Sequence, residues 1–289
     1  MQSWVNYHSH TRYDDGNAEP IEYIKKAIEI GMPAYGYSAH APVNFNTDWC
    51  VPQEKFNQYK DAIKKIKDEY GNKLQIYQGL EIDYIPDIAG KNSNILKDTE
   101  LDYFIGSIHF VDRFQNDDHW NIDTSLELFK KGLISIFDNN IRKAATRYFE
   151  LTRQMIEEDQ PDIIGHMDKI KMFNTKLNLF DETDKWYRDQ VNLTIQCIKK
   201  SGGIVEINTR GYYRYNQPEL YPSLWIVNLL NKAGIPLMIN SDSHKPNEIV
   251  AGMTYCAKKL KKLPVEKIFA LYNNKWKEFL FNENGLIFP

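Results

Sequence analysis

Short apolar runs alternate with amphipathic stretches along the chain, and this alternation limits the choice of fold more than any other feature. The apolar runs are short and end at turn-forming residues, which favours strands. The stretches between them carry apolar residues at helical spacing and several end at a glycine, which favours helices. The sequence therefore predicts strands at 5–7, 33–40, 73–84, 102–110, 161–168, 202–211 and 235–244, and helices at 19–31, 53–71, 124–158 (broken near 138–140), 183–201 and 222–233.

Strands separated by helices are typical of a parallel sheet. The runs DIIG, GIVEI and PLMI are nearly continuously apolar, as strands buried on both faces should be. An open sheet would be expected to carry a glycine-rich phosphate loop after an early strand, and the chain has neither G-x-G-x-x-G nor a P-loop. We therefore expect an α/β fold, a distorted (βα)7 TIM-like barrel forming a single domain over 1–289, with covering helices in the tail at 246–281.

Six of the seven histidines fall at the carboxyl ends of predicted strands, where a β/α barrel builds its active site. Glu81 and Asp242 occupy the same kind of position. On a strand, residues two apart point to the same side, so each of the pairs His8/His10 and Asp242/His244 would converge. The six histidines are His8, His10, His40, His109, His166 and His244, whereas His119 is simplest as a loop residue.

Each of these side chains alone has an ordinary explanation, such as a hydrogen-bonded histidine or a helix cap. Chance placement would nevertheless scatter them, so their gathering at one level of one fold indicates a polynuclear metal site. The candidate ligands include no cysteine, which excludes a structural thiolate site and suits Zn, Mn or Fe. Eight ligand groups exceed the needs of one ion, so two or three divalent metal ions are expected.

Charge and composition limit the kinds of partner that the protein is expected to bind. Lys plus Arg number 36 and Asp plus Glu 39, which gives a formal charge of −3 and argues against a nucleic-acid or membrane partner. The three cysteines are far apart, and the N-terminus lacks the pattern of a secretory signal. We expect a cytoplasmic protein that acts on a small molecule; the oligomeric state is left open.

Five short motifs in order resemble the PHP (polymerase and histidinol phosphatase) family of metal-dependent phosphoesterases. They are HSH at 8–10, AHAP around His40, GLE at Glu81, SIH at His109 and GH at His166, followed by SDSH at 241–244. GLEIDYIPD, PDIIGHMDKIKMFN and VEINTRG further resemble the histidinol-phosphate phosphatases. The resemblance implies a distorted (βα)7 barrel, a trinuclear metal site, and hydrolysis of L-histidinol phosphate to L-histidinol and phosphate in histidine biosynthesis.

The resemblance also implies a ligand set. One ion would be bound by His8, His10, Glu81 and Asp242, a second by Glu81, His109 and His166, and a third by Asp15, His40 and His244. Asp14 is the alternative to Asp15. Ala39 stands where related sequences more commonly carry an acidic residue, which could loosen a contact that supports His40.

By hypothesis, a metal-bridging hydroxide attacks phosphorus, with Glu81 and Asp242 holding the ions. Arg210 or Arg214 would balance the charge of the phosphate oxygens. Glu206 and Asp112 are candidate acceptors for the ammonium and imidazole of the substrate, although a helix cap or a salt bridge explains each as well. Tyr212, Tyr213 and Tyr215 are candidates for the pocket lining, and His119 is a candidate general acid as well as a simple loop residue.

The alternatives are another small phosphate ester (a nucleotide or sugar phosphate) or phosphotyrosine as substrate, a non-catalytic metal-binding module, and a metal-dependent amidohydrolase. The module would be expected to have lost ligands. The amidohydrolase would usually have a bridging lysine and a lone late Asp, whereas this chain has D-x-H.

Overall fold

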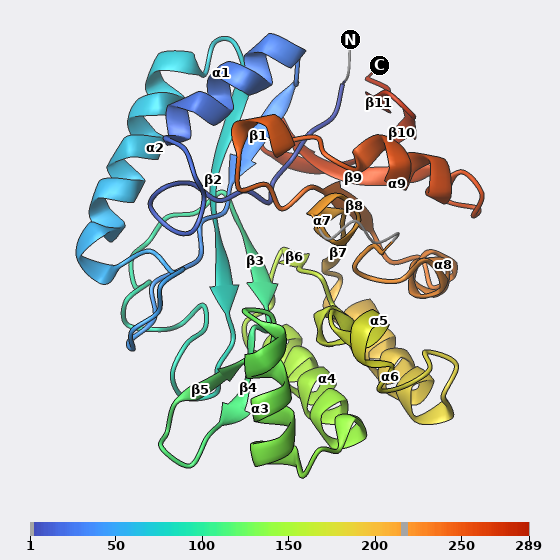
Figure 1. Ribbon diagram of the computed structural model, residues 1–289. Coiled ribbons are helices and arrows are strands. Elements are labelled where there is room, and N and C mark those ends of the chain that lie inside the picture. Colours follow the sequence, from blue (N-terminus) through green and yellow to red (C-terminus); the bar gives the residue numbers. More distant parts are fainter. Residues whose placement is uncertain (1–2, 215–218, 289) are drawn as a thin grey trace.

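A curled parallel sheet forms the centre of the computed structural model, which describes residues 3–214 and 219–288 (Figure 1). Its six strands lie in the order β1–β2–β3–β6–β7–β8, and all neighbours are parallel. The chain is thus an α/β domain with a half-barrel sheet, consistent with the predicted distorted TIM-like barrel. The strands are β1 (Ala34–Tyr37), β2 (Gln75–Asp83), β3 (Tyr103–Ser107), β6 (Ile163–Ile164), β7 (Ile204–Asn208) and β8 (Leu237–Asn240).

The N-terminal segment lies between the two edges of this sheet. Asn6 forms an isolated bridge with Tyr35 of β1, and Ser9 forms one with Ser243, just beyond β8. The backbone N–H of Tyr7 also donates to Asn240 Oδ1 at 2.9 Å. The strand predicted at 5–7 therefore occupies a strand-like place in the barrel, but it pairs through single bridges because side chains take over several of its backbone hydrogen bonds.

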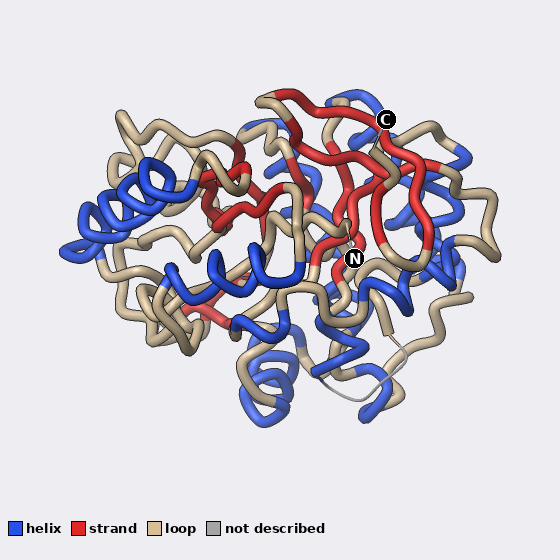
Figure 2. Tube along the Cα trace, turned by 90° about the horizontal axis from the view of Figure 1, so that it is seen from above, coloured by secondary structure: helices blue, strands red, loops and turns tan. Residues whose placement is uncertain are grey.

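Helices lie mostly around the outside of the strands (Figure 2). The breaks and ends follow local chemistry: Asp138 and Asn139 adopt positive φ between two helices, which confirms the predicted break near 138–140. No described helix is long and apolar enough to cross a membrane. The helices are α1 (Pro20–Ile30), α2 (Phe56–Tyr70), α3 (Leu126–Phe137), α4 (Ile141–Glu158), α5 (Asn174–Leu177), α6 (Lys185–Ser201), α7 (Arg210–Arg214), α8 (Leu224–Lys232) and α9 (Met253–Leu260), with 3-10 turns η1 (Gln53–Lys55), η2 (Lys169–Lys171) and η3 (Pro246–Glu248).

The tail differs from the prediction of covering helices. After α9 it forms an antiparallel sheet of β9 (Lys267–Tyr272), β10 (Lys275–Asn282) and β11 (Gly285–Leu286). Asn273 and Asn274 between the first two strands have φ of 53° and 56°, the conformation of a tight hairpin turn that favours asparagine. The prediction holds for α9 but was wrong for the rest of the tail, because this turn and the alternation of buried and exposed residues in 279–282 outweigh the helix-forming lysines and glutamates.

A second hairpin was not predicted. It consists of β4 (Phe110–Arg113) and β5 (His119–Asn121), which form a two-stranded sheet between β3 and α3. His119 therefore lies on a strand, not in a loop, and its ring stacks on Phe45 with the ring centroids 4.3 Å apart.

The barrel interior is held together by tyrosines. Tyr103 of β3 is buried, and its hydroxyl oxygen lies 2.6 Å from the carbonyl oxygen of Tyr7 and 2.8 Å from that of Tyr37. Gly36 and Gly79 leave the room for this ring, because a Cβ at either position would collide with it. Tyr103 thus ties the N-terminal segment to β1 beneath the edge where the histidines gather.

Candidate metal centre

The nine predicted metal ligands come together at the carboxyl edge of the sheet. Glu81 lies near the end of β2, and His109 and His166 follow β3 and β6. Asp242 and His244 follow β8. The bridge between His40 and Glu81 brings the segment after β1 to the same place, and the N-terminal segment supplies His8, His10 and Asp15. Seven of the nine are buried, and Asp15 and His244 are partly exposed at the mouth of the cluster.

Glu81 is the centre of the cluster. Its Oε2 lies 2.9 Å from His8 Nε2 and 3.2 Å from His40 Nδ1. Its Oε1 lies 3.0 Å from His166 Nε2 and 3.7 Å from His109 Nε2, and it accepts a hydrogen bond from Ser107. One carboxylate therefore faces histidines from four different parts of the chain, the arrangement expected of a group that bridges two ions.

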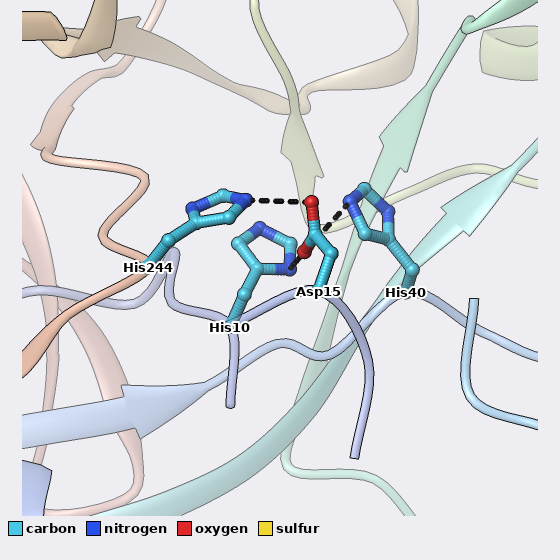
Figure 3. A group of neighbouring side chains, drawn as sticks. All are labelled: His10, Asp15, His40 and His244. Carbon is cyan, nitrogen blue, oxygen red and sulfur yellow. Dashed lines mark hydrogen bonds and ion pairs between the residues drawn. The ribbon is translucent and has the colours of Figure 1, made fainter. Parts of the chain in front are cut away.

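Asp242 and Asp15 form the other side of the cluster. Asp242 Oδ1 lies 3.3 Å from His10 Nε2 and 3.6 Å from His244 Nδ1. Asp15 Oδ2 lies 3.0 Å from His244 Nε2, and its Oδ1 lies 4.0 Å from His40 Nε2. Figure 3 shows His10, Asp15, His40 and His244 pointing toward one another, and their ligand atoms lie within 4.8 Å of each other.

Asp14, the alternative to Asp15, lies behind the cluster. Its Oδ2 is 2.7 Å from His10 Nδ1 and accepts from the backbone N–H of His40, and its Oδ1 accepts from the N–H of Thr11. These contacts orient the His10 ring so that its Nε2 faces Asp242. Asp14 thus supports a ligand, while Asp15 reaches the open side of the cluster.

Two further carboxylates support histidines from behind. Glu206 Oε1 lies 2.6 Å from His8 Nδ1, and Asp83 Oδ1 lies 2.9 Å from His109 Nδ1. Such contacts fix the ring orientation and raise the basicity of the nitrogen that faces a metal. Sequence reasoning missed Asp83, although its spacing of two residues from Glu81 on one strand repeats the pattern of the other ligand pairs.

The electrostatics of the cluster reflect its many carboxylates. Burial acts to raise the pKa of Glu81 and Asp242, but the surrounding histidines, His8 foremost, hold both well below the usual range. Against burial, Asp14 raises the pKa of His10 to about 10, and Asp83 raises that of His109 to about 9. The protons of these histidines thus balance part of the negative charge of the buried carboxylates.

The donor set fits divalent metal ions. Three buried ring nitrogens, His10 Nε2, His40 Nδ1 and His166 Nδ1, make no hydrogen bond of good geometry within residues 3–214 and 219–288, although the first two lie 3.3 Å from Asp242 Oδ1 and 3.2 Å from Glu81 Oε2. Buried polar atoms are rarely left in this way unless an ion or water satisfies them. Imidazole and carboxylate together suit Zn, Mn or Fe, and no described cysteine is near enough to join a ligand group.

A cavity of about 260 Å³ opens over the cluster. Six of its lining residues are predicted ligands. The other lining residues are one aromatic side chain, two cationic side chains, one carboxylate and two neutral polar side chains. They are Trp49, Lys169, Arg210, Asp123, Asn121 and Thr124. The cavity therefore has the size for a small molecule whose anionic end would face the ligands.

The structure distinguishes the two candidate arginines. Arg210 lines the cavity, and its Nη1 donates to the backbone oxygen of Asp242 at 2.8 Å and contacts His244 Nδ1 at 2.8 Å. Arg214, at the other end of α7, is exposed and does not line the cavity. Of the two arginines, Arg210 alone is placed to meet an anion bound in the cavity.

The other residues considered for the substrate lie elsewhere. Glu206 is fully buried behind His8, and Asp112 pairs with Arg147 at 3.1 Å, so neither lines the cavity as an acceptor. Tyr212 stacks on Tyr255, and the Tyr213 hydroxyl donates to the backbone of Asp242. Tyr215 lies outside the described residues. Lys169 and Asp123 do line the cavity. Lys169 lies in the segment PDIIGHMDKIKMFN and Asp123 in WNID, which also resembles the histidinol-phosphate phosphatases, but sequence reasoning assigned no role to either residue.

Comparison with known proteins agrees with this arrangement. The chain is 28% identical over 269 residues to a Schizosaccharomyces pombe protein named "Probable histidinol-phosphatase", covering 87% of this chain and 83% of that protein. It is 26% identical over 259 residues to the histidinol-phosphatase of Bacillus subtilis, covering 84% and 94%. The fold matches that of a histidinol phosphate phosphatase of Lactococcus lactis, solved with zinc, L-histidinol and phosphate, at a TM-score of 0.70 and 18% identity, covering 96% of this chain and all of that one.

The model of the PHP domain matches residues 6–210. This span contains every predicted ligand except Asp242 and His244, and the structure brings those two to the same cluster from the end of β8. Motif order, fold and ligand geometry lead to one conclusion: the chain is a member of the PHP family.

Proposed function

We propose that this protein is a metal-dependent phosphomonoesterase that hydrolyses L-histidinol phosphate to L-histidinol and inorganic phosphate, in histidine biosynthesis. The observation that carries the proposal is the buried cluster around Glu81, whose histidines and carboxylates converge beneath one small cavity. The relatives named as histidinol-phosphatases, which align over most of the chain, support this substrate over other phosphate esters.

Two or three divalent ions, Zn, Mn or Fe, would be held in the cluster. His8, His10, Glu81 and Asp242 would hold one, Glu81, His109 and His166 a second, and Asp15, His40 and His244 a third. The short contacts of Glu81 with His8 and His166, and of Asp15 with His244, support this division. Bound ions would lower the pKa of a coordinated water and neutralise phosphate oxygens.

The residues of the chain would orient the ester and balance its charge. Hydrolysis joins a water oxygen to phosphorus, breaks the bond to the ester oxygen and returns a proton to the leaving alcohol. Arg210, held by the backbone of Asp242, would place its positive charge on the phosphate oxygens, where negative charge must be balanced in the transition state. The supporting carboxylates Asp14, Asp83 and Glu206 would keep the ligand rings in place.

The test is release of phosphate from L-histidinol phosphate, compared with nucleotide and sugar phosphates and with phosphotyrosine, after Mn or Zn has been restored. We expect a strong preference for L-histidinol phosphate, abolished in Asp242→Asn and kept in Asp118→Asn, an exposed carboxylate on the β4–β5 hairpin. Equal or better turnover of another ester would overturn the substrate assignment. Bound metal without turnover of any ester would overturn the assignment as a phosphatase.

A further inference from the structure

Asp123 is a carboxylate in the cavity that belongs to none of the proposed metal sites. It lies in the short connection between β5 and α3, and its side chain is 20% exposed. Its Oδ2 lies 4.0 Å from His109 Nε2, the ring nitrogen that faces Glu81, and 3.4 Å from Lys169 Nζ. The group is thus next to the ligands but on the solvent side of them.

The backbone holds Asp123 firmly in this place. The side-chain oxygen of the buried Asn121 accepts from the N–H groups of both Asp123 and Thr124 at 2.9 Å. The N–H of Ile122 donates to the backbone oxygen of His109 at 3.0 Å. These hydrogen bonds fix Asp123 relative to the proposed metal ligand His109. A group that recognises a substrate needs such a fixed position.

A carboxylate at this position opposes the binding of a simple phosphate monoester, because like charges close together in a partly buried site repel each other. The repulsion becomes an attraction when the ester carries a cation close to its phosphate. A primary ammonium on the carbon next to the ester CH2 meets this requirement. Lys169, whose side chain is 4% exposed, faces the same space and can contact the phosphate itself.

We propose that Asp123 is a specificity-determining residue that accepts the ammonium of an aminoalkyl phosphate, while its partner Lys169 contacts the phosphate. The inference rests on the proposed function, since it places the amine of L-histidinol phosphate at Asp123. It assigns different roles to two neighbouring charges, and these roles can be separated experimentally.

The experiment compares L-histidinol phosphate with its deamino analogue, 3-(imidazol-4-yl)propyl phosphate, in the metal-loaded enzyme. We expect Asp123→Asn to lower kcat/KM for L-histidinol phosphate by roughly 10- to 100-fold, the usual effect of losing a charge-assisted hydrogen bond, and to leave the analogue unchanged or improved. Lys169→Met should lower kcat/KM for both esters alike. Asp118→Asn, on the same hairpin, should change neither.

Metal content and the thermal midpoint of each variant show whether a loss has a structural cause. Equal losses on both esters in Asp123→Asn would refute the inference, as would no loss on either. Calorimetric binding of L-histidinol to the metal-loaded protein gives a second measurement that needs no turnover. If the wild type hydrolyses neither ester, the proposed function fails, and unchanged L-histidinol affinity in Asp123→Asn would then refute the inference separately.

Discussion

Glu206 makes four hydrogen bonds behind the candidate metal centre, and replacing it with glutamine tests how the centre is supported. Its Oε1 is contacted by His8 Nδ1 at 2.6 Å and by Asn240 Nδ2 at 3.0 Å. Its Oε2 accepts from the backbone N–H of His166 at 3.1 Å and from Asn208 Nδ2 at 3.0 Å. Both oxygens therefore face donors, and the residue is fully buried.

A glutamine at this position can present its oxygen to only one of the two donor pairs. In one orientation its NH2 group opposes the donors at His166 and Asn208. In the other it opposes Asn240 and forces the proton of His8 onto Nε2, the nitrogen that faces Glu81. The first orientation loses two hydrogen bonds to a charged group, at about 1.5–3 kcal/mol each, and the second loses one and reverses the contact with His8. Relief from burying a charge offsets part of this cost, so we expect Glu206→Gln to lower the free energy of unfolding by about 2–4 kcal/mol.

The assay combines urea unfolding of the metal-free protein with metal titration of the folded variant. We expect weaker metal binding by roughly 10- to 100-fold, as is common when a contact that supports a metal ligand is removed. Glu150→Gln, an exposed residue on α4, is the matched control and should change neither quantity.

An unfolding free energy within about 0.5 kcal/mol of the wild type, together with unchanged metal affinity, would refute this reasoning. The variant also separates two roles for the residue. If Glu206 contacted the substrate amine, as its position after an apolar strand suggested, the loss would be confined to L-histidinol phosphate. A supporting role predicts the same loss on every ester.

Three further outcomes follow from the contacts described above. Arg210→Met should lower kcat/KM on all phosphate esters by roughly 10- to 100-fold, while Arg214→Met should behave as the wild type, and equal effects would contradict the assignment of the cavity arginine. Tyr103→Phe should cost about 1–3 kcal/mol in urea unfolding, because the one hydroxyl proton serves the buried carbonyls of Tyr7 and Tyr37; a change below about 0.5 kcal/mol would show that these carbonyls find other partners. The pKa of His10 is raised to about 10 and that of His109 to about 9. Protonation of these two histidines therefore stabilises the metal-free protein. This stabilisation is complete below the unfolded pKa near 6.5 and is lost as the pH rises through the folded pKa values. The thermal midpoint of the metal-free protein should therefore fall as pH rises from about 7 to about 10, more than that of the metal-loaded protein, and a midpoint that rises over this range would contradict the sign.

The convergence of the candidate ligands was predictable from the sequence because of one physical rule. The carboxyl ends of neighbouring parallel strands meet at one edge of a sheet, so residues that end separate strands converge. Glu81, His109, His166 and Asp242 follow this rule, and the structure places them together. His8 and His10 also arrive there, although their segment joins the sheet through single bridges.

The residues that support the candidate ligands, and those proposed to select the substrate, reach their places through tertiary contacts. They were therefore not predictable in the same way. Glu206 ends an apolar strand like a ligand, but its partner His8 comes from the opposite end of the chain, so no local pattern shows that it faces inward. Asp123 and Lys169 reach the cavity through the unpredicted β4–β5 hairpin and a 3-10 turn. Asn273-Asn274 did carry a local turn signal, but the lysines and glutamates on either side led to the wrong prediction of helix.

The placement of the N-terminal segment between β1 and β8 has a consequence for assembly. Asn6 and Tyr7 are hydrogen-bonded to Ser241 and Asn240, which lie more than 230 residues away along the chain. His8 and His10 therefore meet Asp242 only after the two ends of the barrel have joined, so a chain still being synthesised lacks Asp242 and His244 and cannot complete the first and third proposed sites. If ions bind His10, Asp242 and His244 as proposed, metal binding would be a late step of folding and would cross-link the N-terminal segment to the residues after β8.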